Sequence, residues 1–164
     1  MSTFRAMLTD LLVELDQSHF PNPPASERQI RQFEERMGWP LDEELRAFYL
    51  HCNGARLFRK KDPNYRILEL EEVVRTRIAI YGRDEAEWGP DSFYIFCDMQ
   101  DTNYVSLDVA RRIDNKYPLF DCFHENFYES DSREMIARCL SDFLKRAFLR
   151  PEGSYWLDDN WTGV

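Results

Sequence analysis

Hydrophobic residues recur every three or four positions in the first third of the chain, a spacing that predicts amphipathic helices. Residues 4–16 form the first helix, and the proline-rich stretch 21–26 ends it because proline cannot continue a helix. Ser26 begins the second helix with a capping box to Gln29, and Gly38 ends it in a left-handed conformation. We therefore expect two helices joined by an extended linker.

A third helix is predicted over residues 40–52, with Pro40 in its first turn and Asn53-Gly54 at its end. The adjacent His51 and Cys52 raise the question of a catalytic pair. Side chains at neighbouring helical positions point about 100° apart, so these two cannot face each other. Cys52 belongs to the apolar stripe, and we interpret it as a buried thiol.

The middle of the chain carries strand patterns. Residues 93–98 are a continuous run of aromatic and β-branched residues typical of a central strand, and residues 103–108 and 117–123 follow it. Weaker strand patterns lie at 55–59 and 65–70. Because short turns separate the three main runs, the spacing predicts an antiparallel meander.

The last third is predicted to contain a long helix over residues 132–149, with Asp131 and Glu134 forming its capping box. An acidic tail with several aromatic residues follows this helix. The sequence leaves open whether the tail docks on the rest of the chain or contacts a partner.

The composition is that of a globular protein with one core. The chain has 164 residues, of which 43% are hydrophobic, and this length fits one domain. No apolar run approaches the roughly 18–20 residues that span a bilayer, so we expect no membrane association. The first 16 residues lack the basic start and apolar stretch of a signal peptide, so the expected location is cytoplasmic.

The net charge of −9 has the wrong sign for a nucleic-acid binder, which normally presents a basic surface to phosphates. An acidic surface instead attracts basic proteins, although it also serves solubility alone. A local basic stretch at residues 56–61 runs against this trend. It could hold an anion, or it could protect the edge of a sheet from aggregation.

Acidic and aromatic residues alternate between Asp98 and Asp131. Eight acidic residues stand there against three basic ones, together with several tyrosines and phenylalanines. This combination is typical of an interface for a basic protein partner, with tyrosines as anchors. A solvated sheet edge above an aromatic core explains the same pattern.

Two sets of residues offer catalytic alternatives. Cys122, His124 and Glu125 could ligate a metal, but the other histidines have no partnered spacing with this segment. Carboxylates near strand ends could perform acid–base chemistry, and the candidates are Asp98, Asp101, Asp108 and Asp121. A role in forming turns explains most of these positions as well. Recognised nucleotide, hydrolase and zinc-protease motifs are missing, and we expect no cofactor and no enzyme activity.

Several segments resemble, in order, the SUKH superfamily of Smi/Knr-type domains. The opening segment "IRQFEERMGWPLDEELRAFYLHCNGARLF" carries Met-Gly, an acidic helix start and an Asn-Gly stop. The segments "YRILELEEV", "FYIFCDMQDTNYVSLDV", "YPLFDCFHEN" and "CLSDFLKRAF" follow in the family's order. The chain departs from the family in having Pro-Leu where Leu-Pro is usual, and no glycine in the turn at 99–101.

The resemblance implies a single α+β domain with helices packed on a mixed or antiparallel sheet, and no enzyme activity. The resemblance covers the Smi/Knr-like domain, which we place at residues 26–149. The N-terminal helix with its proline-rich linker, at residues 1–25, and the acidic aromatic tail, at residues 150–164, are additions to the family pattern. Bacterial members are similar to immunity proteins, which bind and block toxins such as nucleases or deaminases. Other members are regulatory interaction modules, which remain the alternative.

We therefore expect a non-enzymatic immunity protein that occludes a basic toxin domain through an acidic aromatic face. The sequence does not indicate the oligomeric state or the identity of the toxin. The expected contact residues are Trp88, Asp98, Asp101, Asn103, Tyr104, His124, Glu125 and Tyr128.

Overall fold

The centre of the structure is a seven-stranded antiparallel sheet in which each strand pairs with the next one along the chain. The structure, a computed structural model, describes residues 2–58 and 65–164, with side chains from residue 7 onward. Within this part of the chain, no helix is both long and apolar enough to cross a membrane. The strands are β1 (Phe20–Pro21), β2 (Ala55–Arg56), β3 (Arg66–Ile67), β4 (Phe93–Asp98), β5 (Tyr104–Asp108), β6 (Leu119–Cys122) and β7 (Glu134–Ala137).

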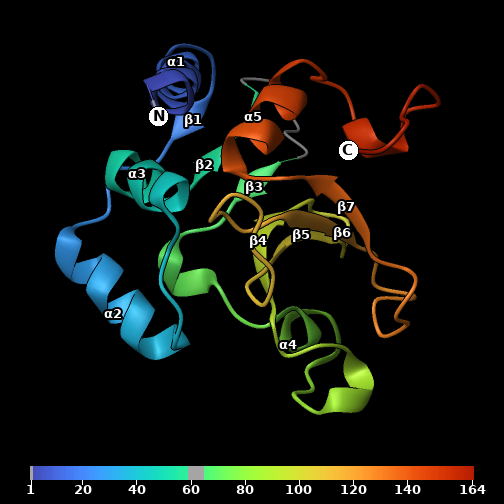
Figure 1. Cartoon of the computed structure of the whole chain (residues 1–164). Helices are drawn as coiled ribbons and strands as arrows, with labels where there is room; N and C mark the ends of the chain where they lie inside the picture. The colour runs from blue at the N-terminus through green and yellow to red at the C-terminus, as the bar shows by residue number, and fades with distance from the viewer. Residues whose placement is uncertain (1, 59–64) are drawn as a thin grey trace.

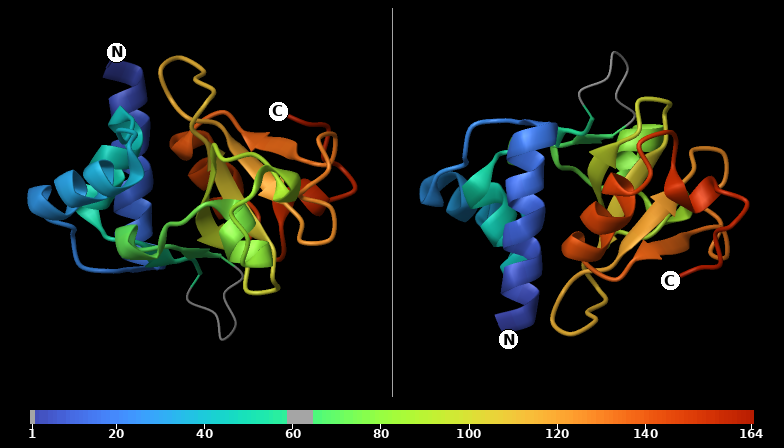
Figure 2. Two further views of the ribbon diagram at one scale, coloured as in Figure 1. Left: turned by 90° about the horizontal axis from the view of Figure 1, so that it is seen from below. Right: turned by 90° about the horizontal axis from the view of Figure 1, so that it is seen from above.

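Helices cover both faces of this sheet (Figure 1). The α5 helix lies on one face and α4 on the other, while α1 packs beside α3 and α5 (Figure 2). This arrangement is the single-domain α+β fold expected from the sequence. The helices are α1 (Ser2–Ser18), α2 (Glu27–Met37), α3 (Glu43–His51), η1 (Leu70–Glu72), α4 (Thr76–Tyr81), η2 (Ala86–Trp88), α5 (Leu140–Phe148) and η3 (Tyr155–Leu157).

Local signals correctly predicted the start and end of α2. Ser26 Oγ accepts from the backbone N–H of Gln29 at 3.1 Å, and the side-chain Oε1 of Gln29 accepts from the backbone N–H of Ser26 at 2.8 Å. Gly38 closes the helix with φ 80°. The α3 helix begins later than predicted, at Glu43, because the Asp42 carboxylate caps it by accepting from an amide of its first turn.

The meander was also predicted, and the bounds of β4 agree with the sequence pattern. In the pairing register, Tyr104 lies opposite Asp98 on one side and Cys122 on the other. The ends of β4 and β6 and the start of β5 therefore lie at the same end of the sheet. Half of the basic stretch 56–61, namely residues 59–61, and all of the loop predicted at 60–64 lie outside the described residues.

The single long helix predicted over residues 132–149 is wrong. Its first part is the edge strand β7, in which Ala137 pairs with Leu119, and only its second part is helical as α5. The buried Glu44 carboxylate marks the start of α5, since it accepts from the Ser141 amide at 2.8 Å and from the Ser141 hydroxyl at 2.9 Å. Pairing and capping by distant residues thus override the helical periodicity.

The two faces of the sheet carry different packing. Val105 and Leu107 belong to the main core, which contains much of α3 and α5. Residues at the alternate positions of β5 face α4, and the Ser106 hydroxyl lies 2.7 Å from that of Thr76. A smaller core on this second face consists of Phe93, Phe120, Cys122 and Phe127.

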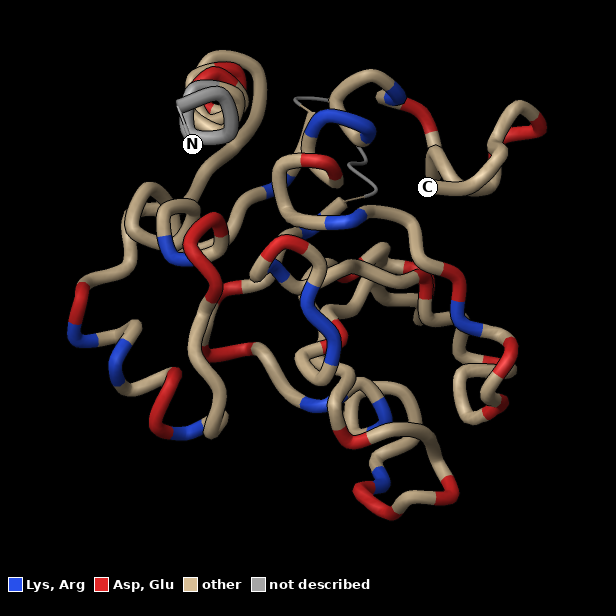
Figure 3. The backbone as a smooth tube through the Cα atoms, in the orientation of Figure 1, with Lys and Arg blue, Asp and Glu red and all other residues tan. Residues whose placement is uncertain are grey.

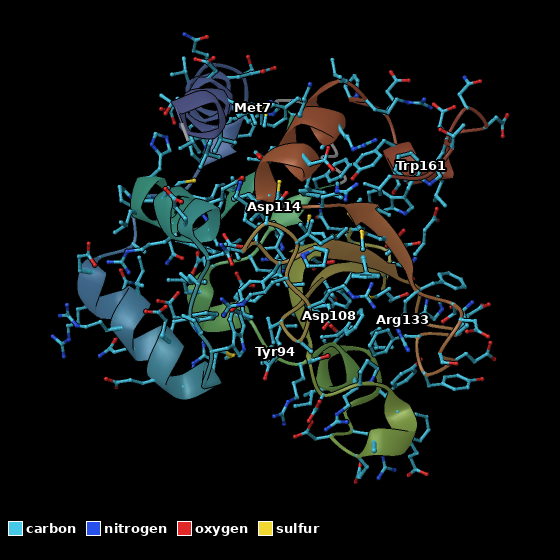
Figure 4. All side chains as sticks on the ribbon, in the orientation of Figure 1. Met7, Tyr94, Asp108, Asp114, Arg133 and Trp161 are labelled. Atoms are coloured by element: carbon cyan, nitrogen blue, oxygen red, sulfur yellow. The ribbon has the colours of Figure 1, made fainter. Side chains whose placement is uncertain are left out.

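The C-terminal tail docks on the domain, which answers the question left open by the sequence. The Tyr155 hydroxyl donates to the Ile136 carbonyl at 2.6 Å, and Trp161 Nε1 donates to Glu134 Oε1 at 2.6 Å. Trp161 thus lies close to β7 (Figure 4). The Arg146 guanidinium of α5 lies over its ring, 5.3 Å from the centroid. The indole of the buried Trp156 hydrogen-bonds the Asp121 carboxylate.

We predict that the charge of Asp121 destabilises the folded protein at neutral pH. Burial raises the pKa of Asp121 from 3.8 to about 6; the hydrogen bond from Trp156 opposes this shift, and the charges of Glu134 and Asp101 add to it. The folded state thus binds the carboxyl proton of Asp121 more tightly than the unfolded state does. The contribution of this carboxyl to the free energy of unfolding therefore falls as pH rises from about 4 to about 6. Asp121→Asn should raise the free energy of unfolding by on the order of 1 kcal/mol at about pH 7.5, and by much less at about pH 4.

Urea denaturation of both proteins at the two pH values measures this difference. An Asp121→Asn variant that differs from wild type equally at both pH values would show that the carboxyl keeps its ordinary pKa in the folded state.

A second stability prediction concerns Glu44. Glu44→Ala removes the acceptor for Ser141 and the ion-pair partner that lies 2.9 Å from Lys116 Nζ. We expect a loss of about 3 kcal/mol in the free energy of unfolding, because the deleted carboxylate is buried and paired. The matched control is Glu27→Ala, which breaks the exposed pair with Arg46 and should cost less than about 1 kcal/mol. Equal losses in the two variants, measured by chemical denaturation, would contradict this role of Glu44.

Candidate protein-binding surface

The turn between β4 and β5 is formed by the predicted acidic residues themselves. Asp98 Oδ1 accepts from the backbone N–H of Gln100 at 2.7 Å, and Asp101 Oδ1 accepts from the backbone N–H of Asn103 at 3.1 Å. Gln100 and Thr102 adopt positive φ angles of 62° and 69°. Short side-chain acceptors thus stabilise this turn without a glycine.

Asn103 joins this turn to the segment that follows β6. Its Oδ1 accepts from the backbone amide of His124 at 3.0 Å and lies 3.0 Å from His124 Nδ1. The imidazole side chain is 40% exposed, and its Nε2 lies 4.0 Å from Glu125 Oε1. Four of the expected contact residues therefore form one cluster: Asp101, Asn103, His124 and Glu125.

Asp98 and Tyr104 lie beside this cluster on adjacent strands. The Asp98 carboxylate forms an ion pair with Arg66, with Oδ2 3.1 Å from Nη2, but Arg66 also pairs with Glu72, so the charge of Asp98 is partly offset within the chain. Tyr104 is half-buried, and burial, followed by the charge of Asp98, raises the pKa of its hydroxyl. These two residues contribute more to pairing of β3, β4 and β5 than to the charge of the surface.

The two remaining expected residues, Trp88 and Tyr128, meet through Tyr81. The ring centroid of Tyr81 lies 5.1 Å from that of Trp88 and 6.2 Å from that of Tyr128. The Tyr81 hydroxyl donates to the His124 carbonyl at 3.0 Å, and burial raises the pKa of this hydroxyl. Tyr81 was not predicted, yet it connects the three-ring cluster to the Asn103–His124 cluster.

Close packing holds the two loops of the three-ring cluster together. A Cβ atom placed on Gly89 would lie 2.6 Å from the Phe127 ring, so only glycine permits this approach. The Gly89 carbonyl also accepts from Arg77 Nη1 at 2.9 Å, and the Arg133 guanidinium lies over the Phe127 ring. The loops are therefore tightly positioned relative to each other.

The same loops carry most of the local negative charge. Loop 82–91 has four acidic residues against one arginine, and loop 123–133 has three against one (Figure 3). Glu87 and Glu129 are exposed beside Trp88 and Tyr128, and the Tyr128 ring itself is 47% exposed. We call these two loops, the turn at 99–103 and Tyr81 the acidic loop surface.

The structure brings together only part of each set of catalytic candidates: His124 and Glu125 are neighbours at the surface, whereas Cys122 is buried in the smaller core. Within the described residues, no group of three or more His, Cys, Asp or Glu side chains is arranged to hold a metal ion. Asp98 and Asp108 lie at opposite ends of the β4–β5 pair, and Asp121 hydrogen-bonds Trp156. Burial raises the pKa of Cys52 to about 12, so its thiol stays protonated as the helix-stripe interpretation requires.

An α+β domain with an antiparallel meander and an ordered loop surface is the class that these features define. A sequence model of the SMI1 / KNR4 family (SUKH-1) matches residues 24–146, and the chain belongs to this family. The chain is also 25% identical over 126 residues to immunity protein YokJ of Bacillus subtilis (strain 168). The matched region covers 76% of this chain and 74% of YokJ. The family resemblance of the sequence is thereby confirmed, and α1 and the C-terminal tail lie outside the matched span.

We predict that Gly89→Ala separates the two loops of the acidic loop surface. The added methyl group collides with Phe127, and φ 122° disfavours any side chain, so the expected loss is about 2–3 kcal/mol in the free energy of unfolding. Gly82→Ala is the matched control: its φ is also positive, at 67°, but its Cβ meets open space, and the expected loss is about 1 kcal/mol. Equal losses of the free energy of unfolding in denaturation experiments would show that the close contact with Phe127 adds nothing to the cost of Gly89→Ala.

Proposed function

We propose that this protein is an immunity protein that binds a bacterial toxin domain in the cytoplasm and blocks it by occlusion. The family membership and the similarity to an immunity protein support this role. In this proposal the toxin is of the nuclease or deaminase type. The immunity protein itself catalyses no reaction and binds neither nucleic acid nor membrane.

The acidic loop surface is the proposed contact. A nuclease or a deaminase acting on nucleic acid needs a positive cleft to hold phosphates, and a net charge of −9 complements such a cleft. The surface carboxylates accelerate association, and the exposed aromatic rings supply contact area once the proteins meet.

One observation carries this choice of surface. The backbone of His124 donates to Asn103 and accepts from Tyr81, each at 3.0 Å, so the end of α4, the β4–β5 turn and the loop that follows β6 form one ordered unit. A surface that is ordered before binding loses little conformational entropy in the complex. This lower entropic cost favours tight inhibition of a toxin.

Co-expression with the product of the adjacent gene tests the proposed function. We expect that product to stop growth when it is expressed alone, and growth to recover when this protein is present. Binding without rescue is the result expected of a regulatory interaction module, and it would overturn the immunity role.

We predict that neutralising three surface acids slows association with the toxin. The variant Asp101→Asn/Glu125→Gln/Glu129→Gln should reduce the association rate constant by about tenfold or more at low salt and weaken its salt dependence. The control Asp10→Asn/Glu14→Gln/Glu35→Gln changes the net charge equally on exposed residues of α1 and α2. Surface plasmon resonance at several ionic strengths measures both, and equal effects of the two variants would place the contact elsewhere.

A further inference from the structure

We propose that the three-ring cluster of Tyr81, Trp88 and Tyr128 is a binding site for one arginine side chain of the protein partner. This inference rests on the proposed function, since it assigns the partner's chemistry at the same surface. The site is a stacking surface for a guanidinium group, bordered by carboxylates.

The rings are held in position before any ligand arrives. Tyr81 lies between the other two, inclined by 43° to Trp88 and by 62° to Tyr128. Its hydroxyl is fixed on the His124 carbonyl, and the contact of Gly89 with Phe127 sets the distance between the two loops. Trp88 is half-buried and Tyr128 is nearly half exposed, so solvent reaches the cluster.

Elsewhere five of the chain's arginines lie over six of its aromatic rings. Guanidinium carbons lie 5.3 to 5.6 Å from ring centroids at Phe33, Phe93, Phe120, Phe127, Tyr117 and Trp161. Among the described residues, no arginine or lysine occupies this position over Tyr81, Trp88 or Tyr128. The nearby Arg75 and Arg77 are instead paired with Asp84. The cluster is therefore a ring surface of the same kind without an internal cation.

The surrounding charges favour a cation and select arginine. Glu87 adjoins Trp88 and Glu129 adjoins Tyr128 in the chain, and both are exposed. A guanidinium group stacks on a ring through its flat face and donates hydrogen bonds from its edge to carboxylates, whereas an ammonium group cannot stack. An arginine on a protruding loop of a basic toxin matches all of these features.

The direct test uses a probe that needs no toxin. The peptide acetyl-Gly-Arg-Gly-amide is titrated into the full-length protein while the indole N–H signal of Trp88 is followed by NMR. The matched probe replaces arginine with citrulline, which keeps the shape and loses the charge, and a third peptide carries lysine. We expect a saturable shift at Trp88 with at least about fivefold tighter binding of the arginine peptide than of either other peptide.

Two variants test whether the arginine peptide binds at the three-ring cluster. Tyr128→Leu removes an exposed ring of the cluster and should weaken the arginine peptide several-fold, while Phe123→Leu removes a 36% exposed ring outside the cluster and should leave it within about twofold. Equal binding of the arginine and citrulline peptides, tightest binding of the lysine peptide, or equal effects of the two variants would overturn the inference. Because growth rescue is scored without these peptides, the two failures are distinguishable: failure here leaves the immunity role standing, and failure of rescue removes the toxin as the source of the arginine while the measured preference of the rings for arginine remains.

Discussion

The backbone of His124 is the point on which the arrangement of the acidic loop surface depends. Its N–H donates to Asn103 in the β4–β5 turn, and its carbonyl accepts from Tyr81 at the end of α4. Both bonds are made by main-chain atoms of His124. Three segments that are separate in the sequence thereby form one surface.

The meander makes this convergence possible. Because neighbouring strands are antiparallel, the end of β4, the start of β5 and the end of β6 meet at one end of the sheet. The α4 helix crosses the face that carries Ser106 and brings Tyr81 to the same end. The opposite face is filled by the main core and the C-terminal tail, so the two faces serve different purposes.

Elements whose stabilising contacts lie within a few residues could be predicted from the sequence. The capping box of Ser26 and Gln29 and the apolar run of β4 are examples. The predicted helix over residues 132–149 failed because Glu44, 97 positions from Ser141, sets where α5 begins. Composition pointed to Trp88 and Tyr128, but no local pattern shows that Tyr81 reaches a carbonyl 43 positions away.

The central claim is that the acidic loop surface is the contact for a toxin, and amide hydrogen exchange tests it most directly. Exchange is compared for the free protein and for its complex with the toxin identified by growth rescue. We expect added protection in residues 81–91, 99–104 and 123–129, with little change on α1 and α2. Protection confined to α1, α2 or the C-terminal tail would contradict the claim.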